Sequence, residues 1–574
     1  MPESILVLTL TRIGDLVQAT PLIAGLRKKY PEAKITQVVS SDFAEFAERI
    51  PHVDETIVFD LRQFKEKQEG TLWVNVYRYL ENFMDSLKGR GFDLMVNLSH
   101  SKLSAFMNLY LDMKEFIGFA CNETGDRMSR HPWMQYFGIE PFNRAYNPFN
   151  LVEIFTRSGD VDPGSEAIQI LPQADDEASI QNLLEEHSIQ EGELLIGVQA
   201  GSSIEGRRWP TRYFAELIDR LSSEMNARVL LFGVASESSL AKDIIDTVAN
   251  KEKVVDLTGR TKINQLVAML GKCRYLVTND TGTMHIAAAL GVRIVGLFFA
   301  HAHPWETGPF APGNIIFQSR ISCAPCSYGV ECNNIICIHT VKPHHVFDAM
   351  QYHHVSGNWN VDRNNSEMNV YTTDFASDNR FRLRSLMRHA LTMEDVFREL
   401  YFRLWPAVLS GQEVALQWEP GESPQEIFAS EYQCDEADGL IHKLEEKKTA
   451  LEQLMQLARN GSKSATRLLK KVSNRQLTNT GLMQFKDDFE ALDKSIAGLG
   501  WSHPELKPVA DMFSKRKENF QGDDIVQLAR ATQACYQQLE IESLELKRLV
   551  ETVDLRSRNY FKEHSSMSVD VPGK

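Results

Sequence analysis

Short apolar runs alternate with helical patterns of apolar residues from residue 4 to residue 298 of this 574-residue chain. Strand-like runs fall at residues 4–10, 35–39, 55–59, 92–97, 194–198, 228–232, 254–257, 275–277 and 292–298. Strands that alternate with helices predict doubly wound parallel sheets, which bind ligands beyond the carboxyl ends of their strands. We therefore expect an α/β fold of two Rossmann-like halves facing a cleft.

The chain is too long for a single core, so two to four domains are expected. We expect one Rossmann-like domain at residues 1–170, a second at 171–355, a polar linker at 356–380 and an all-α region at 381–574. Residues 120–165 suggest a long loop that crosses between the halves. The leucine stripe of the helical region fits a bundle that packs on itself or a partner-binding coiled coil.

The formal net charge of −15 argues against a general nucleic-acid binder and against electrostatic attachment to an anionic membrane. No apolar run approaches the roughly 20 residues of a membrane-spanning helix. The N-terminal residues lack the basic region and the cleavage site of a signal peptide. We therefore expect a cytoplasmic protein without a transmembrane segment.

The stretch at residues 279–291 combines the features of an anion site. Asp280 and Thr281 follow a strand, Gly282 permits a tight turn, and His285 lies in the first turn of the predicted helix. Such a turn aims backbone N–H groups and the positive end of the helix dipole at one point, which suits a nucleotide diphosphate. The alternative is an ordinary Asp/Thr helix cap.

Two acidic residues also follow predicted strands and glycine-containing turns. Asp15, in the sequence Arg12-Ile-Gly-Asp15, could act as a general base, or it could cap the helix that we expect from residue 16. Glu237, after Gly233, could take ribose hydroxyls or lie on the surface.

A Gly/Ser turn at residues 199–203 precedes two arginines, Arg207 and Arg208. Backbone N–H groups of such a turn can cradle phosphate, and a guanidinium suits bidentate phosphate contact. A nearby guanidinium would neutralise a pyrophosphate leaving group. The alternative is a solvated basic loop.

Four of the eight cysteines gather within fifteen positions, at Cys323, Cys326, Cys332 and Cys337. A tetrathiolate pattern suits Zn²⁺ or a single iron, and such a closed site would be structural. Reduced thiols in a tight loop and a redox pair are the alternatives. Disulfides are less expected in a cytoplasmic chain.

Two separated motifs resemble glycosyltransferase family nine, the ADP-heptose heptosyltransferases. The first is Ile13-Gly14-Asp15 followed by Thr20-Pro21, Leu26-Arg27 and Tyr30-Pro31. The second is Asp280-Thr281-Gly282 with His285, then residues 287–291 and Gly296-Leu297-Phe298, and the Arg207 and Glu237 motifs lie between them in the expected order. The resemblance covers roughly residues 1–350.

The resemblance implies a GT-B fold and inverting transfer of a heptose from ADP-heptose without a catalytic metal. It implies that the first domain binds the acceptor and the second the nucleotide sugar. Asp15 would be the catalytic base, and Arg207, where the family usually has Lys, would stabilise the diphosphate leaving group. The donor-binding residues that it implies are Arg12, Gly14, Ser202, Arg208, Glu237, Asp280, Thr281, Gly282, Thr283 and His285.

The cysteine cluster and the helical region depart from the simple lipopolysaccharide enzymes of the family. The cluster resembles the cysteine-rich metal-binding segment of some members, including iron-binding heptosyltransferases that modify autotransporter proteins. The acceptor is therefore either a lipopolysaccharide-type glycan or a protein. Two alternatives stay open: a transferase that uses another nucleotide sugar, and a scaffold protein with an inactive core that acts through its helical region. Peripheral contact with the inner membrane and a homo-oligomer are also left open.

Overall fold

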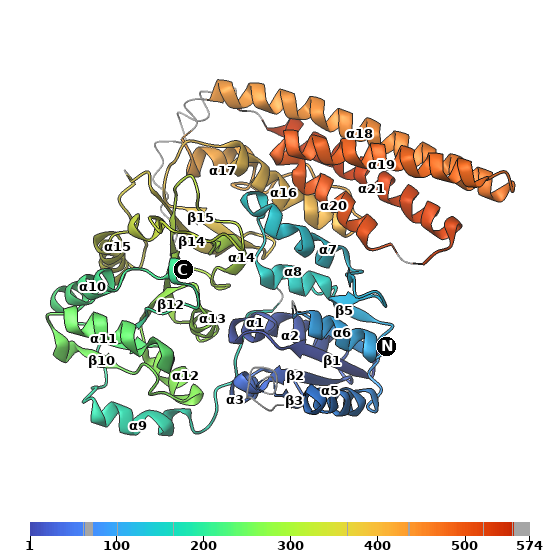
Figure 1. Cartoon of the computed structure of the whole chain (residues 1–574). Helices are drawn as coiled ribbons and strands as arrows, with labels where there is room; N and C mark the ends of the chain where they lie inside the picture. The colour runs from blue at the N-terminus through green and yellow to red at the C-terminus, as the bar shows by residue number, and fades with distance from the viewer. Residues whose placement is uncertain are drawn as a thin grey trace. The chain divides into compact units, whose positions relative to one another are not determined.

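The computed structural model describes residues 1–60, 62, 73–99, 101–164, 166–363, 365–433, 437–520, 522–553 and 555. The chain divides into two compact units (Figure 1). Unit 1 comprises Met1–Arg127 and Asn150–Met387, and unit 2 comprises Met128–Phe149 and Arg388–Lys574.

The first sheet of unit 1 has five parallel strands in the order β3-β2-β1-β4-β5. Its strands are β1 (Ser4–Thr9), β2 (Lys34–Ser40), β3 (Glu55–Phe59), β4 (Leu94–Asn97) and β5 (Phe116–Gly118). The helices of this part are α1 (Ile13–Gln18), α2 (Thr20–Lys29), α3 (Ala44–Ala47), α5 (Trp73–Lys88) and α6 (Lys102–Tyr110). Residues 5–9 of β1 are buried, as expected for a central strand that helices cover on both faces.

The second sheet of unit 1 has eight strands in the order β10-β9-β8-β11-β12-β13-β14-β15, and the first six are parallel. Its parallel strands are β8 (Leu195–Gln199), β9 (Arg228–Phe232), β10 (Val254–Asp256), β11 (Tyr275–Asn279), β12 (Arg293–Phe298) and β13 (Ile315–Ser319). The helices of this part are α8 (Leu151–Ser158), α9 (Asp176–Glu186), α10 (Thr211–Glu224), α11 (Ser238–Thr247), α12 (Ile263–Lys272), α13 (Gly282–Ala289), α14 (Pro304–Thr307) and α15 (Pro343–Ser356).

The strand order reverses once in each sheet, between β1 and β4 and between β8 and β11. At such a switch point the loops that follow neighbouring strands diverge and leave room for a ligand. The three motifs that follow β1, β8 and β11 therefore all begin at switch points, which agrees with the prediction of doubly wound sheets.

The predicted polar linker at residues 356–380 is wrong. This segment contains β14 (Met368–Phe375), which pairs antiparallel with β13 and with β15 (Phe381–Ser385). Its buried residues, among them Met368 and Val370, alternate with more exposed ones, which is the period of a strand with one buried face. The all-α region expected from residue 381 likewise begins with a strand, and its first helix, α16 (Met393–Leu409), begins only at Met393.

The predicted turn at residues 11–15 is also wrong, because α1 begins at Ile13 and places Asp15 inside its first turn. Arg12 is the residue that precedes the helix, so Asp15 is not its N-cap. In place of the one helix expected from residue 16, the structure has two helices that meet at Ala19. Pro21 lies near the start of α2, where its missing N–H costs little.

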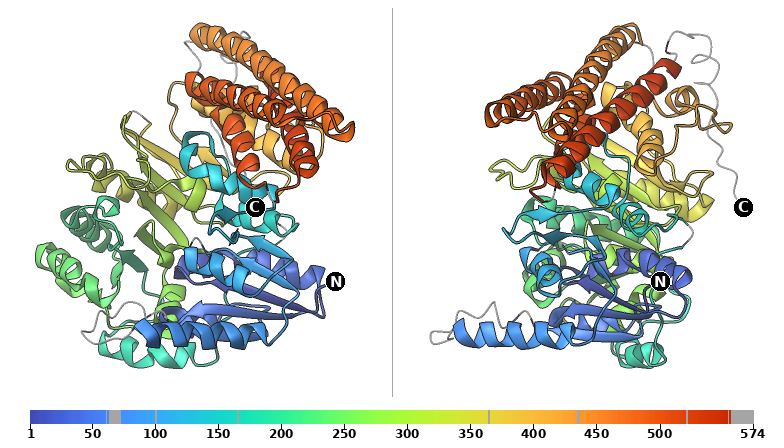
Figure 2. Two further views of the ribbon diagram at one scale, coloured as in Figure 1. Left: turned by 45° about the vertical axis from the view of Figure 1, so that its right-hand side comes forward. Right: turned by 90° about the vertical axis from the view of Figure 1, so that its right-hand side faces the viewer.

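Unit 2 is mainly helical. Besides α16 it contains α7 (Pro132–Ile139), α17 (Pro424–Glu431), α18 (Ala437–Ser473), α19 (Asn479–Ser502), α20 (Lys507–Glu518) and α21 (Ile525–Thr552). The long helices α18 and α21 lie side by side (Figure 2). None of the described helices is both long and apolar enough to span a membrane.

The loop expected at residues 120–165 is largely structured. It contains the short strands β6 (Ala120–Cys121) and β7 (Arg127–Met128) and the helices α7 and α8. In unit 2, the rings of Trp133 and Tyr136 on α7 pack edge to face, and Tyr136 also contacts Trp405 of α16. Aromatic residues that suggested a loop in the sequence are therefore core residues of a helical unit.

Candidate functional site

The turn after β11 has the predicted strand–turn–helix form. Thr281 is the extended residue that precedes α13, and its side chain makes no capping hydrogen bond. The ordinary Asp/Thr cap that the sequence left open is therefore absent. Gly282 is the first residue of α13, and His285 lies in the first turn, buried.

The two signature segments of unit 1 touch through their glycines. A Cβ added to Gly282 would lie 2.3 Å from Cγ2 of Ile13 and 3.3 Å from the backbone nitrogen of Gly14. A Cβ added to Gly14 would lie 3.0 Å from Cδ2 of His285. Only glycine at these positions lets the first turns of α1 and α13 approach so closely. The helix that carries Asp15 is thereby held against the helix that carries the predicted anion site.

Asp15 is a half-buried carboxyl that accepts a hydrogen bond from the hydroxyl of Thr11. Burial raises its pKa above the ordinary value, while the Thr11 hydrogen bond and the Arg12 charge oppose that rise. A carboxylate with a raised pKa is a stronger base than one in water. This environment suits a group that must take a proton from an alcohol.

Arg207 and Asp280 form a buried ion pair, with 3.2 Å between Nη1 and Oδ2. Burial raises the pKa of Asp280, and the charge of Arg207 and a hydrogen bond from Thr307 oppose the rise. The pair holds the guanidinium at the end of β11, where a buried Arg suits the neutralisation of phosphate oxygens. Asp280 therefore orients Arg207, and it is also the first residue of the turn between β11 and α13.

Three buried polar atoms around this turn have no hydrogen-bond partner among the described residues: Nε of Arg207, Oγ of Ser202 and Nδ1 of His285. Leaving a buried donor unsatisfied costs about 1–3 kcal/mol. Burial lowers the pKa of His285 to about 4, so its imidazole is neutral at pH 7 and can donate one hydrogen bond. Unpartnered groups of this kind suit a bound anion, which offers several acceptor oxygens.

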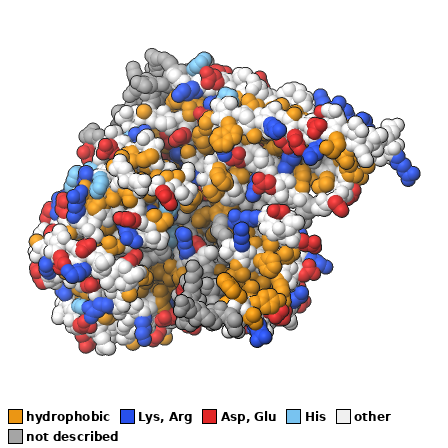
Figure 3. Space-filling view, viewed as in Figure 1, with side chains coloured by type: hydrophobic (Ala, Val, Ile, Leu, Met, Phe, Trp, Pro, Cys, Tyr) orange, Lys and Arg blue, Asp and Glu red, His pale blue; other side chains and the backbone are white. Residues whose placement is uncertain are grey.

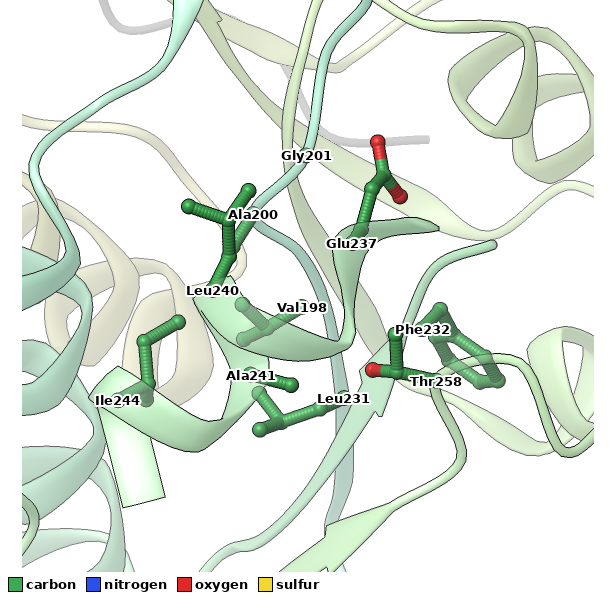
Figure 4. A pocket seen from close by; sticks show the side chains of 10 residues that line it. All are labelled: Val198, Ala200, Gly201, Leu231, Phe232, Glu237, Leu240, Ala241, Ile244 and Thr258. Carbon is green, nitrogen blue, oxygen red and sulfur yellow. The ribbon is translucent and has the colours of Figure 1, made fainter. Parts of the chain in front are cut away.

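A small pocket that is partly open to solvent lies between the ends of β8 and β9 and helix α11 (Figure 4). Its lining is mostly aliphatic, from Val198, Leu231, Leu240, Ala241 and Ile244, with Glu237 and Thr258 as polar groups. The carboxylate of Glu237 lies at one end, beside Gly201 (Figure 4). An apolar slot that ends in a carboxylate suits a nucleoside, whose base is flat and whose ribose carries hydroxyls.

The other predicted donor-binding residues lie in the loop after β8, in the turn after β11 and, for Arg12, just before α1. Nε of Arg208 donates to the carbonyl of Ser202 at 2.8 Å, so this arginine stabilises the loop after β8. The hydroxyl of Thr281 lies 3.2 Å from that of Thr278, and the Thr283 hydroxyl donates to Gln199 at 3.5 Å. Arg12 is exposed, and its charge lowers the pKa values of both Asp15 and Asp280.

Two residues that position the site escaped the sequence analysis. Asn279 accepts from the backbone N–H of Trp209 at 3.1 Å and donates to the carbonyl of Ala200 at 2.8 Å, so it ties the β8 loop to the end of β11. Gln199 donates to Glu237 at 3.0 Å. Both are polar residues at the last position of a buried apolar strand, and that is the signal that could have found them.

The cysteine segment lies next to the loop after β12. Cys323 and Cys332 are exposed, Cys326 is half-buried and Cys337 is buried. Burial raises the pKa of Cys337, backbone N–H groups of Ala300 and Ile338 lower it, and the nearby Cys323 and Cys332 raise it further. Among the described residues, no three His, Cys, Asp or Glu side chains are close enough together to hold a metal ion.

Residues 81–334 match the family model of glycosyltransferase family 9 (heptosyltransferase). Lipopolysaccharide heptosyltransferase 2 of Salmonella typhimurium is 25% identical over 297 residues, which span 51% of this chain and 82% of that protein. Lipopolysaccharide heptosyltransferase 1 of Pseudomonas aeruginosa is 24% identical over 56% of this chain and 85% of its own length. The crystal structure of a family 9 glycosyl transferase from Veillonella parvula, 22% identical, covers 61% of this chain and 96% of its own with a TM-score of 0.50, so it shares the α/β fold. Residues 81–334 therefore belong to glycosyltransferase family 9, and the protein is an enzyme of the glycosyltransferase class.

Proposed function

We propose that this glycosyltransferase transfers a heptose from ADP-heptose to an acceptor hydroxyl with inversion at the anomeric carbon. The observation that carries the proposal is the contact of α1 with α13 at Gly14 and Gly282. This contact brings a helix with a half-buried carboxyl against a helix whose first turn carries the unpartnered Nδ1 of His285. A base and a leaving-group site on facing elements are what a direct displacement requires.

In the proposed reaction the Asp15 carboxylate takes the proton of the acceptor hydroxyl. The acceptor oxygen forms a bond to the anomeric carbon as the bond from that carbon to the phosphate oxygen breaks, and ADP departs. Arg207 neutralises the charge that develops on the diphosphate, and Ser202 and His285 donate hydrogen bonds to it. Because these donors are fixed before the reaction, they stabilise the transition state without reorganising.

The pocket between β8, β9 and α11 is the proposed site of the nucleoside. Its aliphatic side chains would cover the base, and Glu237, held by Gln199 and by the backbone N–H of Val234, would accept hydrogen bonds from the ribose. The proposed acceptor is a lipopolysaccharide-type glycan, as the names of the relatives suggest, or a protein. The proposed role of the four clustered cysteines is to hold a structural zinc or iron ion, with no part in the transfer.

The proposal predicts that Asp15→Asn removes transfer and keeps donor binding. A general base contributes about 10²–10⁴-fold to a rate, so transfer of labelled heptose from ADP-heptose should fall by at least a hundredfold. ADP affinity, measured by calorimetry, should stay within a factor of three. Asp112→Asn is the matched control, because Asp112 is exposed and has a positive φ that Asn tolerates. Full transfer by Asp15→Asn would rule out this base.

A further inference from the structure

Three basic side chains converge on one tyrosine at the start of α10 in unit 1. Nζ of Lys342 donates to the hydroxyl of Tyr213 at 3.0 Å and lies 5.2 Å from the ring centroid. The guanidinium carbon of Arg212 lies 5.0 Å from the same centroid. The His339 ring contacts Tyr213 edge to face, with 5.9 Å between centroids. Lys, Arg and His side chains gather over α10 and α15 at the left of Figure 3.

No carboxylate balances this cluster. Neither Arg212 nor Lys342 forms an ion pair with any Asp or Glu of the described chain, although the protein carries a net charge of −15. Burial alone would raise the pKa of Tyr213, yet the hydrogen bonds and charges of Lys342 and Arg212 lower it below the ordinary value. The local field around the phenol is therefore positive, and two cations held close together without a counter-ion attract an anion.

Two helix N-termini meet at the same place. The 14-residue helices α10 and α15 pack against each other. The indole N–H of Trp209 donates to the carbonyl of Val341 at 2.9 Å, which ties the segments that precede the two helices. The positive ends of both helix dipoles thus add to the charges of Arg212 and Lys342.

The cluster uses none of the residues assigned to the diphosphate. Arg207 is paired with Asp280, and Nε of Arg208 donates to the carbonyl of Ser202. Arg212 follows on α10, and Lys342 and His339 come from the segment after the cysteines. Nδ1 of His339 is a buried atom that has no hydrogen-bond partner among the described residues.

We infer that Arg212, Lys342, Tyr213 and His339 form a second anion site, which takes a phosphate monoester. The guanidinium of Arg212 binds two phosphate oxygens, and the ammonium of Lys342 neutralises the remaining charge. The inference goes beyond the proposed transfer reaction and does not depend on the donor. A free phosphorylated sugar and the headgroup of phosphatidic acid share this chemistry.

The test measures phosphate binding to the full chain in saturating ADP, which fills a diphosphate site if that site exists. Inorganic phosphate and glucose 6-phosphate are titrated by calorimetry, and vesicles with phosphatidic acid or phosphatidylglycerol are tested by co-sedimentation. The variant is Arg212→Gln/Lys342→Gln. The control, Arg260→Gln/Lys272→Gln, removes the same charge from two unit 1 side chains that are paired with Glu186 and Glu177. Circular dichroism and melting temperature check that both variants fold.

The expected result is millimolar or tighter binding of a phosphate monoester that weakens at least tenfold in the variant and is unchanged in the control. Binding of the soluble esters alone assigns a free ligand, and binding of phosphatidic acid over phosphatidylglycerol assigns a lipid headgroup. An equal loss in both double variants, unchanged binding in Arg212→Gln/Lys342→Gln, or no binding of any probe overturns the inference. If ADP does not bind, that result counts against the proposed function. The comparison of phosphate binding between the two double variants still tests the second anion site.

Discussion

Asp15 and Asp280 are two carboxyl groups of unit 1 with different partners. Burial raises both pKa values. A buried guanidinium 3.2 Å away pairs with Asp280 and keeps that carboxylate occupied. Asp15 has instead a neutral hydroxyl donor, from Thr11, and an exposed Arg12 nearby. Asp15 therefore fits the proposed role of general base better than Asp280 does.

The Thr11 hydroxyl should set the acid limb of the pH profile. Its hydrogen bond lowers the pKa of Asp15, so Thr11→Val should raise that pKa further. Because the base acts only when ionised, kcat/KM falls as pH drops through this pKa, and the limb should move to higher pH in the variant. Thr247→Val, whose hydroxyl donates to the backbone carbonyl of Asp243, is the control. The measurement is kcat/KM against pH. If the acid limb stays at the same pH in Thr11→Val, Asp15 is not the group that titrates.

The glycine contact makes a separate prediction. Gly282→Ala places a methyl group 2.3 Å from Cγ2 of Ile13, so α1 and α13 must separate, at a cost of about 1–3 kcal/mol for overpacking. We expect a lower melting temperature and a larger loss of transfer than of ADP binding, partly restored by adding Ile13→Ala. Gly271→Ala, on α12 with nothing within 4 Å of the added methyl, is the control. Full activity of Gly282→Ala would show that the close approach is not needed.

Among single residues, the sequence predicts those whose role depends on their neighbours in the chain. Asp280, Thr281 and Gly282 could be placed because strand, turn and helix follow one another in the chain. Asn279 and Gln199 could be noticed from their places at strand ends, but their roles could not be predicted. Their partners at Ala200, Trp209 and Glu237 are distant in the sequence or on another element.

Among the elements, strands β14 and β15 at the edge of the second sheet could not be predicted from the amino-acid composition of their segment. Asn- and Asp-rich residues surround β14, and they indicate a linker. The strand forms nevertheless because it pairs with β13 and because Met368, Val370 and Thr373 are buried. A pattern read residue by residue cannot distinguish such a strand from a polar loop until the neighbouring strands are known.

The proposed metal site at the four clustered cysteines can be tested directly. Protein purified anaerobically without added metal should contain about one zinc or iron per chain, measured by inductively coupled plasma mass spectrometry. Cys323→Ser/Cys332→Ser should lose it, because both thiols lie near Cys337. Cys535→Ser, which changes a buried cysteine of unit 2, should keep it. Metal-free wild-type protein from such a preparation would contradict the prediction.

At the scale of the whole molecule, the sequence predicts the repeated α/β pattern well and the division into units poorly. A boundary at residue 170 follows from reading the chain in order. Unit 2 instead combines residues 128–149 with residues after 387. Asn143 donates to Asp511 at 2.9 Å, and the backbone N–H of Ser129 donates to Asn519 at 2.7 Å. Contacts across more than 300 positions leave no periodic signal in the sequence.

The proposed function depends on which nucleotide the protein binds. The most direct measurement is calorimetry of the full chain with ADP, UDP, GDP and ADP-heptose, repeated with Arg207→Lys. We predict that ADP and ADP-heptose bind at least tenfold more tightly than UDP and GDP, and that Arg207→Lys weakens both adenine ligands. Equal binding of UDP, or no binding of any of the four, would contradict the assignment of ADP-heptose as donor.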